Sequence, residues 1–123
     1  MKILLLDSDS GRRNDLKYLL ELHNNEVVSA YDYEVADQII KENFGNIEGN
    51  FDLFIIRSIN GEGKREVSLK DKARAKFPDI KVITTIHNTG MDGLATANEE
   101  LPPYSVIYTD AITKYLKHFK IIT

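Results

Sequence analysis

Several features that narrow the class of a protein are missing from this chain. The 123 residues include no cysteine, which excludes disulfides and thiolate metal ligands. Basic residues are not in excess, with 16 Lys and Arg against 19 Asp and Glu, so direct contact with nucleic acid is not expected. No apolar run approaches the ~20 residues that cross a bilayer, and the start is too short for a signal peptide. These absences indicate a soluble, cytoplasmic protein without a membrane partner.

The opening stretch is the most informative part of what is present. Residues 3–6 form an unbroken aliphatic run, which is typical of a strand buried on both faces. Asp7 and Asp9 follow this run directly, before a helical pattern begins. In open α/β sheets, ligands and chemistry collect at the carboxyl ends of strands. Asp7 and Asp9 are therefore candidate site residues.

Strand-like and helical patterns alternate along the rest of the chain. The patterns predict strands at 3–6, 26–30, 52–56, 81–86 and 105–108. They predict helices at about 10–23, 33–43, 65–76, 94–100 and 111–120. Such alternation requires a parallel sheet with helices on both faces. We expect an α/β fold, a doubly wound five-stranded parallel sheet of flavodoxin-like order 2-1-3-4-5, in one domain spanning 1–123.

Four segments in this order resemble the receiver domain of response regulators, the CheY-like family of two-component signalling. They are the strand with its acidic end at 2–9, the strands at 52–56 and 82–83, and the stretch 107–109 before the last helix. The resemblance covers essentially the full length and implies the same fold. Its implied chemistry needs an acidic pair that holds Mg²⁺, a phosphoacceptor aspartate, a hydroxyl and a lysine, each at the end of a strand.

The residues at those positions depart from the family pattern. Asp7 and Asp9 fall on the acidic cluster, with Ser8 in place of one acid, and Arg57 stands where the phosphoacceptor aspartate is expected. Ile86 falls on the hydroxyl position. Thr85 is one residue away, and we expect it to point to the opposite side of the strand.

The lysine position is occupied by Asp110. One interpretation is a charge swap, in which Arg57 pairs with Asp110 across the crevice or reaches Asp7 or Asp9 and takes the place of the metal. The other is that Arg57 and Asp110 are unrelated, solvated residues at strand ends. Either way, we expect a degenerate crevice with no catalytic residue, no metal ligand set and no cofactor.

Asp7 and Asp9 leave two further interpretations open. They fit a strand-end acid and a helix cap, which needs no function. They also fit the Asp-x-Asp of haloacid-dehalogenase-like phosphatases, in which the first aspartate is the nucleophile. The alternative function is therefore a small α/β enzyme, phosphatase-like or nucleotide-binding, that uses Asp7 and Asp9.

Receivers commonly pair through the face formed by their fourth helix, fifth strand and fifth helix. In this chain that face would be built from apolar and tyrosine side chains, with Leu101, Lys114 and Lys117 nearby: Met91, Leu94, Tyr104, Tyr108 and Tyr115. Tyrosine with mixed charge is common in partner surfaces. The resemblance thus implies a pseudo-receiver, a non-enzymatic module that binds a protein partner or itself independently of phosphorylation.

Overall fold

The computed structural model describes residues 1–42, 50–58, 63–86 and 103–123, which contain a five-stranded sheet. Its strands are β1 (Lys2–Leu6), β2 (Glu26–Ala30), β3 (Leu53–Arg57), β4 (Lys81–Ile86) and β5 (Tyr104–Tyr108). Every neighbouring pair is parallel, and the order is β2-β1-β3-β4-β5. The predicted sheet and its strand order are confirmed.

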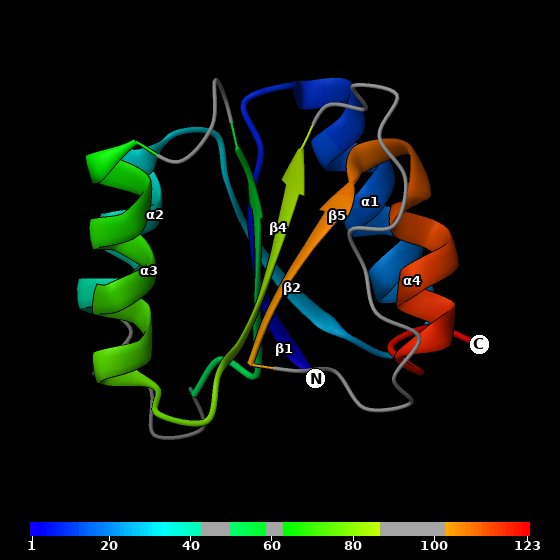
Figure 1. Ribbon diagram of the computed structural model, residues 1–123. Coiled ribbons are helices and arrows are strands. Elements are labelled where there is room, and N and C mark those ends of the chain that lie inside the picture. Colours follow the sequence, from blue (N-terminus) through cyan, green and yellow to red (C-terminus); the bar gives the residue numbers. More distant parts are fainter. Residues whose placement is uncertain (43–49, 59–62, 87–102) are drawn as a thin grey trace.

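Helices cover both faces of this sheet (Figure 1). The helices are α1 (Ser10–Leu22), α2 (Tyr33–Glu42), α3 (Lys64–Lys76) and α4 (Ile112–His118), with a 3₁₀ turn, η2 (Thr109–Ala111), leading into α4. Figure 1 shows α2 and α3 on one side of the sheet and α1 and α4 on the other. The helix predicted at 94–100 lies outside the described residues. In the described ranges, no helix has the length and apolar character needed to cross a membrane.

The sheet separates two hydrophobic clusters, and the side chains of β1 alternate between them. Leu4 and Leu6 pack in the cluster under α2 and α3, whereas Ile3 and Leu5 pack in the cluster under α1 and α4. All four side chains are buried. This burial on both faces explains the unbroken aliphatic run, since each such side chain stabilises the fold by about 2 kcal/mol on leaving water.

The turn from β1 into α1 is set by Asp9. This residue is the N-cap of α1, with extended backbone, and its Oδ1 accepts a hydrogen bond from the Gly11 amide at 3.2 Å. The cap satisfies an amide that has no partner within the helix. Asp9 is thereby the predicted helix cap, and the first turn of α1 lies beside the carboxyl end of β1.

Candidate functional site

Asp7 follows the carboxyl end of β1, which lies between β2 and β3 in the sheet. Its amide donates to the Ala30 carbonyl at 3.1 Å, which continues the β1 to β2 pairing by one residue. Only 4% of Asp7 is exposed. A buried carboxylate requires compensating charge and hydrogen bonds, because its desolvation is otherwise costly.

Arg12 in the first turn of α1 supplies that compensation. Its Nε lies 2.5 Å from Asp7 Oδ2 and its Nη2 lies 2.8 Å from Asp7 Oδ1, so the ion pair is bidentate. The Asp9 amide adds a third donor to Oδ1 at 2.9 Å. This hydrogen bonding to Asp7 raises the pKa of Arg12 against the opposing effect of its own burial. Both carboxylate oxygens of Asp7 are therefore occupied by donors from its own chain.

Sequence reasoning had assigned no role to Arg12, although a signal was available. Arg12 and Arg13 stand in the first turn of α1, and the helix dipole disfavours positive charge there. Arginines in that position indicate a compensating partner. Arg13 completes the arrangement, since its Nη1 donates to the Asp7 carbonyl oxygen at 2.8 Å.

Arg57 ends β3 and points into the same crevice. Its Nη1 donates a hydrogen bond to Thr109 Oγ1, and this hydroxyl in turn donates to the Ile86 carbonyl at 2.9 Å. The pKa of Arg57 is lowered chiefly by burial and then by the positive charge of Arg12, while Asp7 acts in the opposite direction. Arg57 is thus a partly buried guanidinium whose hydrogen-bond acceptor is neutral.

The predicted charge swap, in which Arg57 pairs with Asp110, is wrong, because Arg57 has a different partner. Asp110 is exposed in the η2 turn, and its neighbour Thr109 is the residue that meets Arg57. The carboxylate of Asp7 is likewise paired by Arg12 rather than by Arg57. The reason is geometric, because β5 ends at Tyr108 and the chain turns before Asp110.

Thr85 was expected to face away from the crevice, with Ile86 in the hydroxyl position, and this prediction is also wrong. The β3 to β4 register pairs Arg57 with Thr85, so their side chains lie on the same face of the sheet. Both line a cavity of about 40 Å³ together with Asp7, Arg12 and Thr109. Ile86 follows on the opposite face by strand alternation.

The remaining crevice residues have simpler placements. Ser8 is exposed, and Asp9 Oδ2 lies 3.4 Å from Arg12 Nη1 in addition to its capping role. Within the described ranges, no group of three His, Asp or Glu side chains is arranged to hold a metal ion.

The predicted interaction face is only partly described and is not uniform. Met91 and Leu94 lie outside the described residues. Tyr104 is 45% exposed and its ring lies 4.3 Å from the Arg74 guanidinium of α3. Tyr115 packs against the core under α1 and α4 and stacks on Phe119 at 6.2 Å. Tyr108 is half-buried, so Tyr104 is the exposed tyrosine of this group.

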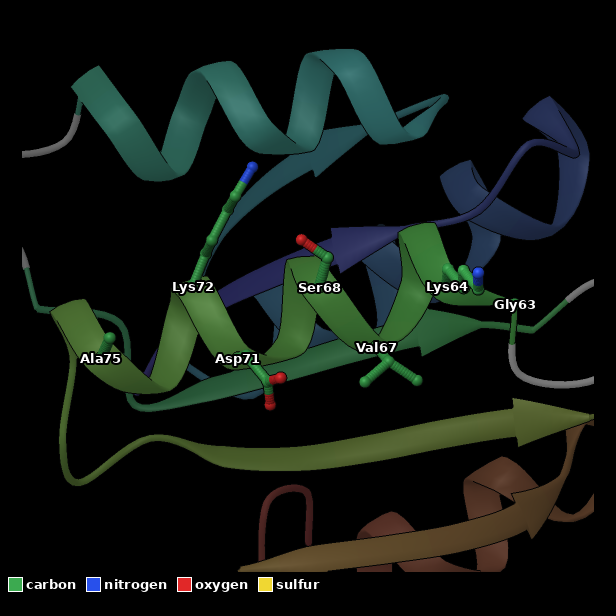
Figure 2. A pocket seen from close by; sticks show the side chains of 7 residues that line it. All are labelled: Gly63, Lys64, Val67, Ser68, Asp71, Lys72 and Ala75. Atoms are coloured by element: carbon green, nitrogen blue, oxygen red, sulfur yellow. The ribbon is translucent and has the colours of Figure 1, made fainter.

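A second concave region lies on α3, away from the crevice. It is an open hollow of about 590 Å³ on the outer surface of the helix. Figure 2 shows Val67 and Asp71 projecting toward β4, whereas Ser68 and Lys72 project toward α2. The described residues that line this hollow are all exposed, and none of them is a buried polar group, so the lining provides no site chemistry.

The strand order and the two helical layers are those of the CheY-like fold, which response-regulator receiver domains share. A receiver domain protein from Clostridium thermocellum is 20% identical, with a TM-score of 0.63 over 97% of this chain and 94% of that one. The receiver domain of NtrC4 from Aquifex aeolicus is 19% identical, with a TM-score of 0.63 over 98% and 94%. At these identities, the likeness establishes the CheY-like fold.

A third similar structure was determined with ligands in place. The response regulator TrrA from Thermotoga maritima, in complex with Mg²⁺ and BeF, is 22% identical, with a TM-score of 0.59 over 98% of both chains. No family model matches the sequence, and no curated protein matches it.

Proposed function

We propose that this protein is a pseudo-receiver, a cytoplasmic regulatory module that acts through protein contacts and does not take up a phosphoryl group. The observation that supports this most is the bidentate pairing of Arg12 with Asp7, beside an arginine at the end of β3. In the family pattern, these two strand ends hold the metal and the phosphoacceptor.

Electrostatics indicate why the metal would be excluded. A divalent cation about 6 Å from a guanidinium is repelled by about 5 kcal/mol at an effective dielectric of 20. The crevice contains Arg12 and Arg57, and both oxygens of Asp7 already accept hydrogen bonds from Arg12. A cation would have to displace Arg12 and overcome the repulsion from Arg57. The receiver-like TrrA, by contrast, was crystallised with Mg²⁺.

The enzyme alternative is less well supported. A phosphatase of the Asp-x-Asp type needs an accessible nucleophilic carboxylate. Asp7 is buried and held by Arg12, and Asp9 caps a helix. Asp7, which holds the nucleophile position of that pattern, is therefore not accessible to a substrate in this arrangement.

The chemical part of the proposal is tested with acetyl phosphate and millimolar Mg²⁺. We expect intact-mass spectrometry to find no added phosphoryl group, while a phosphorylatable receiver treated in parallel gains one. An added phosphoryl group mapped to an aspartate of this chain would refute the proposal.

We place the partner surface on the side of β5 that faces α3. Tyr104 and Val106 are exposed there at 45% and 37%. Tyr104→Ala should weaken self-association or partner binding, as measured by sedimentation velocity, with and without acetyl phosphate. The matched control is Tyr18→Ala, because Tyr18 on α1 is 66% exposed on the other side of the sheet. Equal effects of the two changes would argue against a surface at β5.

A further inference from the structure

A larger cavity lies between α3 and the strands β4 and β5. Its volume is about 210 Å³, and we call it the α3–β5 cavity. Thr84 lines it from β4, whereas the next residue, Thr85, lines the small cavity of the crevice. Successive side chains of a strand point to opposite faces of a sheet. The α3–β5 cavity is therefore separate from the crevice and shares no lining residue with the small cavity around Arg57.

The polar group at the sheet side of this cavity is the hydroxyl of Thr84. Only 3% of Thr84 is exposed, and in the described ranges no hydrogen bond to its hydroxyl is found. A buried hydroxyl without a partner has given up its hydrogen bonds to water and gained none in return. The Thr84 hydroxyl therefore favours a ligand that brings a hydrogen-bonding group to the sheet.

The charges around the α3–β5 cavity balance each other. Lys70 is a buried lining residue, and its Nζ lies 3.2 Å from the carboxylate of the buried Glu66. Asp71 lines the cavity from the exposed side of α3, and Arg74, one turn further along the helix, contacts Tyr104. One charge of each sign is thus present both inside and at the rim. This balance favours a neutral group over an ion.

The walls of the cavity are apolar and partly open to solvent. Val67 projects from α3 toward β4 (Figure 2), and Val106 and Tyr104 belong to β5. All three are exposed, Val67 at 40% and Val106 at 37%. Sites that enclose a whole small molecule usually measure about 300–1,000 Å³. A cavity of about 210 Å³ with exposed apolar walls is better matched to a single side chain of a larger partner.

We propose that the α3–β5 cavity receives a tyrosine side chain of the protein partner, with the ring between Val67 and Val106 and the hydroxyl at Thr84. Tryptophan, tyrosine and arginine are the residues that most often anchor a protein interface. The positive charges of Lys70 and Arg74 disfavour an arginine. Tryptophan is larger, and its indole has no acceptor for the Thr84 hydroxyl, whereas a phenol can both donate and accept.

The inference rests on the proposed function, because it names the group that the partner would bring to the surface at β5. The test is an NMR titration of the ¹⁵N-labelled protein with N-acetyltyrosinamide and with N-acetylphenylalaninamide, which differ by one hydroxyl. We expect the tyrosine derivative to bind about fivefold more tightly, which corresponds to one net hydrogen bond. The largest shifts should fall on the amides of Val67, Thr84 and Val106. Absence of binding, or shifts centred elsewhere, would overturn the proposal.

A substitution on β4 tests the contact with the hydroxyl. Thr84→Val keeps the branched shape of the side chain and removes its hydroxyl, so the two derivatives should bind equally. Thr85→Val is the matched control, since Thr85 lies on the other face of the sheet, and it should retain the fivefold preference. A preference that survives Thr84→Val would contradict the proposed contact. Circular dichroism of each variant confirms that it is folded.

A substitution on α3 tests the position of the ring. Val67→Trp should fill the cavity and weaken both derivatives at least about tenfold, whereas Val67→Ala leaves it open and should bind both. Val67 is exposed, so neither change is expected to prevent folding. Binding that is unchanged in Val67→Trp would place the ring elsewhere and refute the proposal.

A titration with p-cresol separates a partner side chain from a free phenol. Binding of N-acetyltyrosinamide at least as tight as that of p-cresol supports a side chain carried by a peptide. Tighter binding of p-cresol would overturn the proposal and assign the cavity to free phenols.

None of these titrations contains a phosphodonor, so they are independent of the acetyl phosphate test. A chain that is phosphorylated by acetyl phosphate refutes the proposed function. A chain that is not phosphorylated and binds neither derivative refutes this inference alone.

Discussion

Two buried carboxylates, each with a cationic partner, are held in different ways on the two sides of this sheet. Asp7, at the end of β1, accepts two hydrogen bonds from Arg12 and one from the Asp9 amide. Glu66 of α3 is paired with Lys70 at 3.2 Å, and its side chain is 1% exposed against 7% for Lys70. The first pair is open to solvent on its cationic side, with 35% of the Arg12 side chain exposed.

The hydrogen bonding of Glu66 is less complete. Its Oε1 accepts from the Tyr33 hydroxyl at 3.4 Å, while Oε2 meets Lys70 without hydrogen-bond geometry. A buried pair of this kind contributes little net stability, although breaking it is costly. The two carboxylates therefore differ in the number of hydrogen bonds they accept: three for Asp7 and one for Glu66. Of the two, it is the Asp7 carboxylate that is fixed in one orientation.

The largest effect is expected from breaking the α3 pair on one side. Lys70→Met leaves Glu66 charged and buried, so we expect the free energy of unfolding to fall by about 3 kcal/mol at pH 7. Urea denaturation measures this loss.

The double variant Lys70→Met with Glu66→Leu is the control for that experiment. It removes both charges and should regain most of the lost stability. A single variant as stable as the wild type would mean that Glu66 does not depend on Lys70.

Removing Arg12, the cation that pairs with Asp7, should have the next largest effect on stability. Arg12→Gln removes two of the three hydrogen bonds described above for the Asp7 carboxylate and leaves the one from the Asp9 amide. We expect a loss of about 2 kcal/mol in urea denaturation. Arg13→Gln is the matched control, since Arg13 contacts a backbone carbonyl and its loss should cost less. Similar losses in both variants would indicate that the bidentate geometry is unimportant.

A more exposed ion pair on α2 shows how small the contribution to stability is when the charges remain in contact with water. Asp37 of α2 pairs with Lys41 at 2.9 Å and Lys72 at 3.3 Å, and its pKa lies below the ordinary 3.8 mainly because of the hydrogen bond from Lys41. A lowered carboxyl pKa stabilises the fold above pH 3.8 and loses that contribution as pH falls through the folded-state value.

Asp37→Asn should therefore lower stability by roughly 0.5 kcal/mol at pH 7. The difference from the wild type should vanish at pH 2, which acid-series denaturation measures. A loss as large as that of Arg12→Gln would remove the distinction between exposed and buried pairs.

The smallest effect is expected at Arg57, although it shares the crevice with Arg12. Burial and the charge of Arg12 both disfavour its positive form, so Arg57→Gln should change the unfolding free energy by less than about 0.5 kcal/mol. Thermal or urea denaturation of the Arg57→Gln and Arg12→Gln variants, measured side by side, compares their unfolding free energies. A loss of several kcal/mol would show that Arg57 is held by a partner as strong as Asp7.

Local patterns determined most of the fold but not the contacts of the site. The aliphatic run at 3–6 and the alternation of elements predicted the parallel sheet and its order, because burial on both faces leaves a direct record in the sequence. The Asp9 cap was predictable for the same reason, since a cap acts within one helical turn.

By itself, therefore, the sequence determined the sheet, its two helical layers and the acidic end of β1. Only the tertiary structure decided which guanidinium neutralises Asp7, and that Thr85 and Thr109 share the cavity with Arg57. The pairing of β3 with β4 places Thr85, and the end of β5 before Asp110 places Thr109. A shift of one residue in either strand exchanges the faces of its side chains, and it is pairing with the neighbouring strand that sets this register.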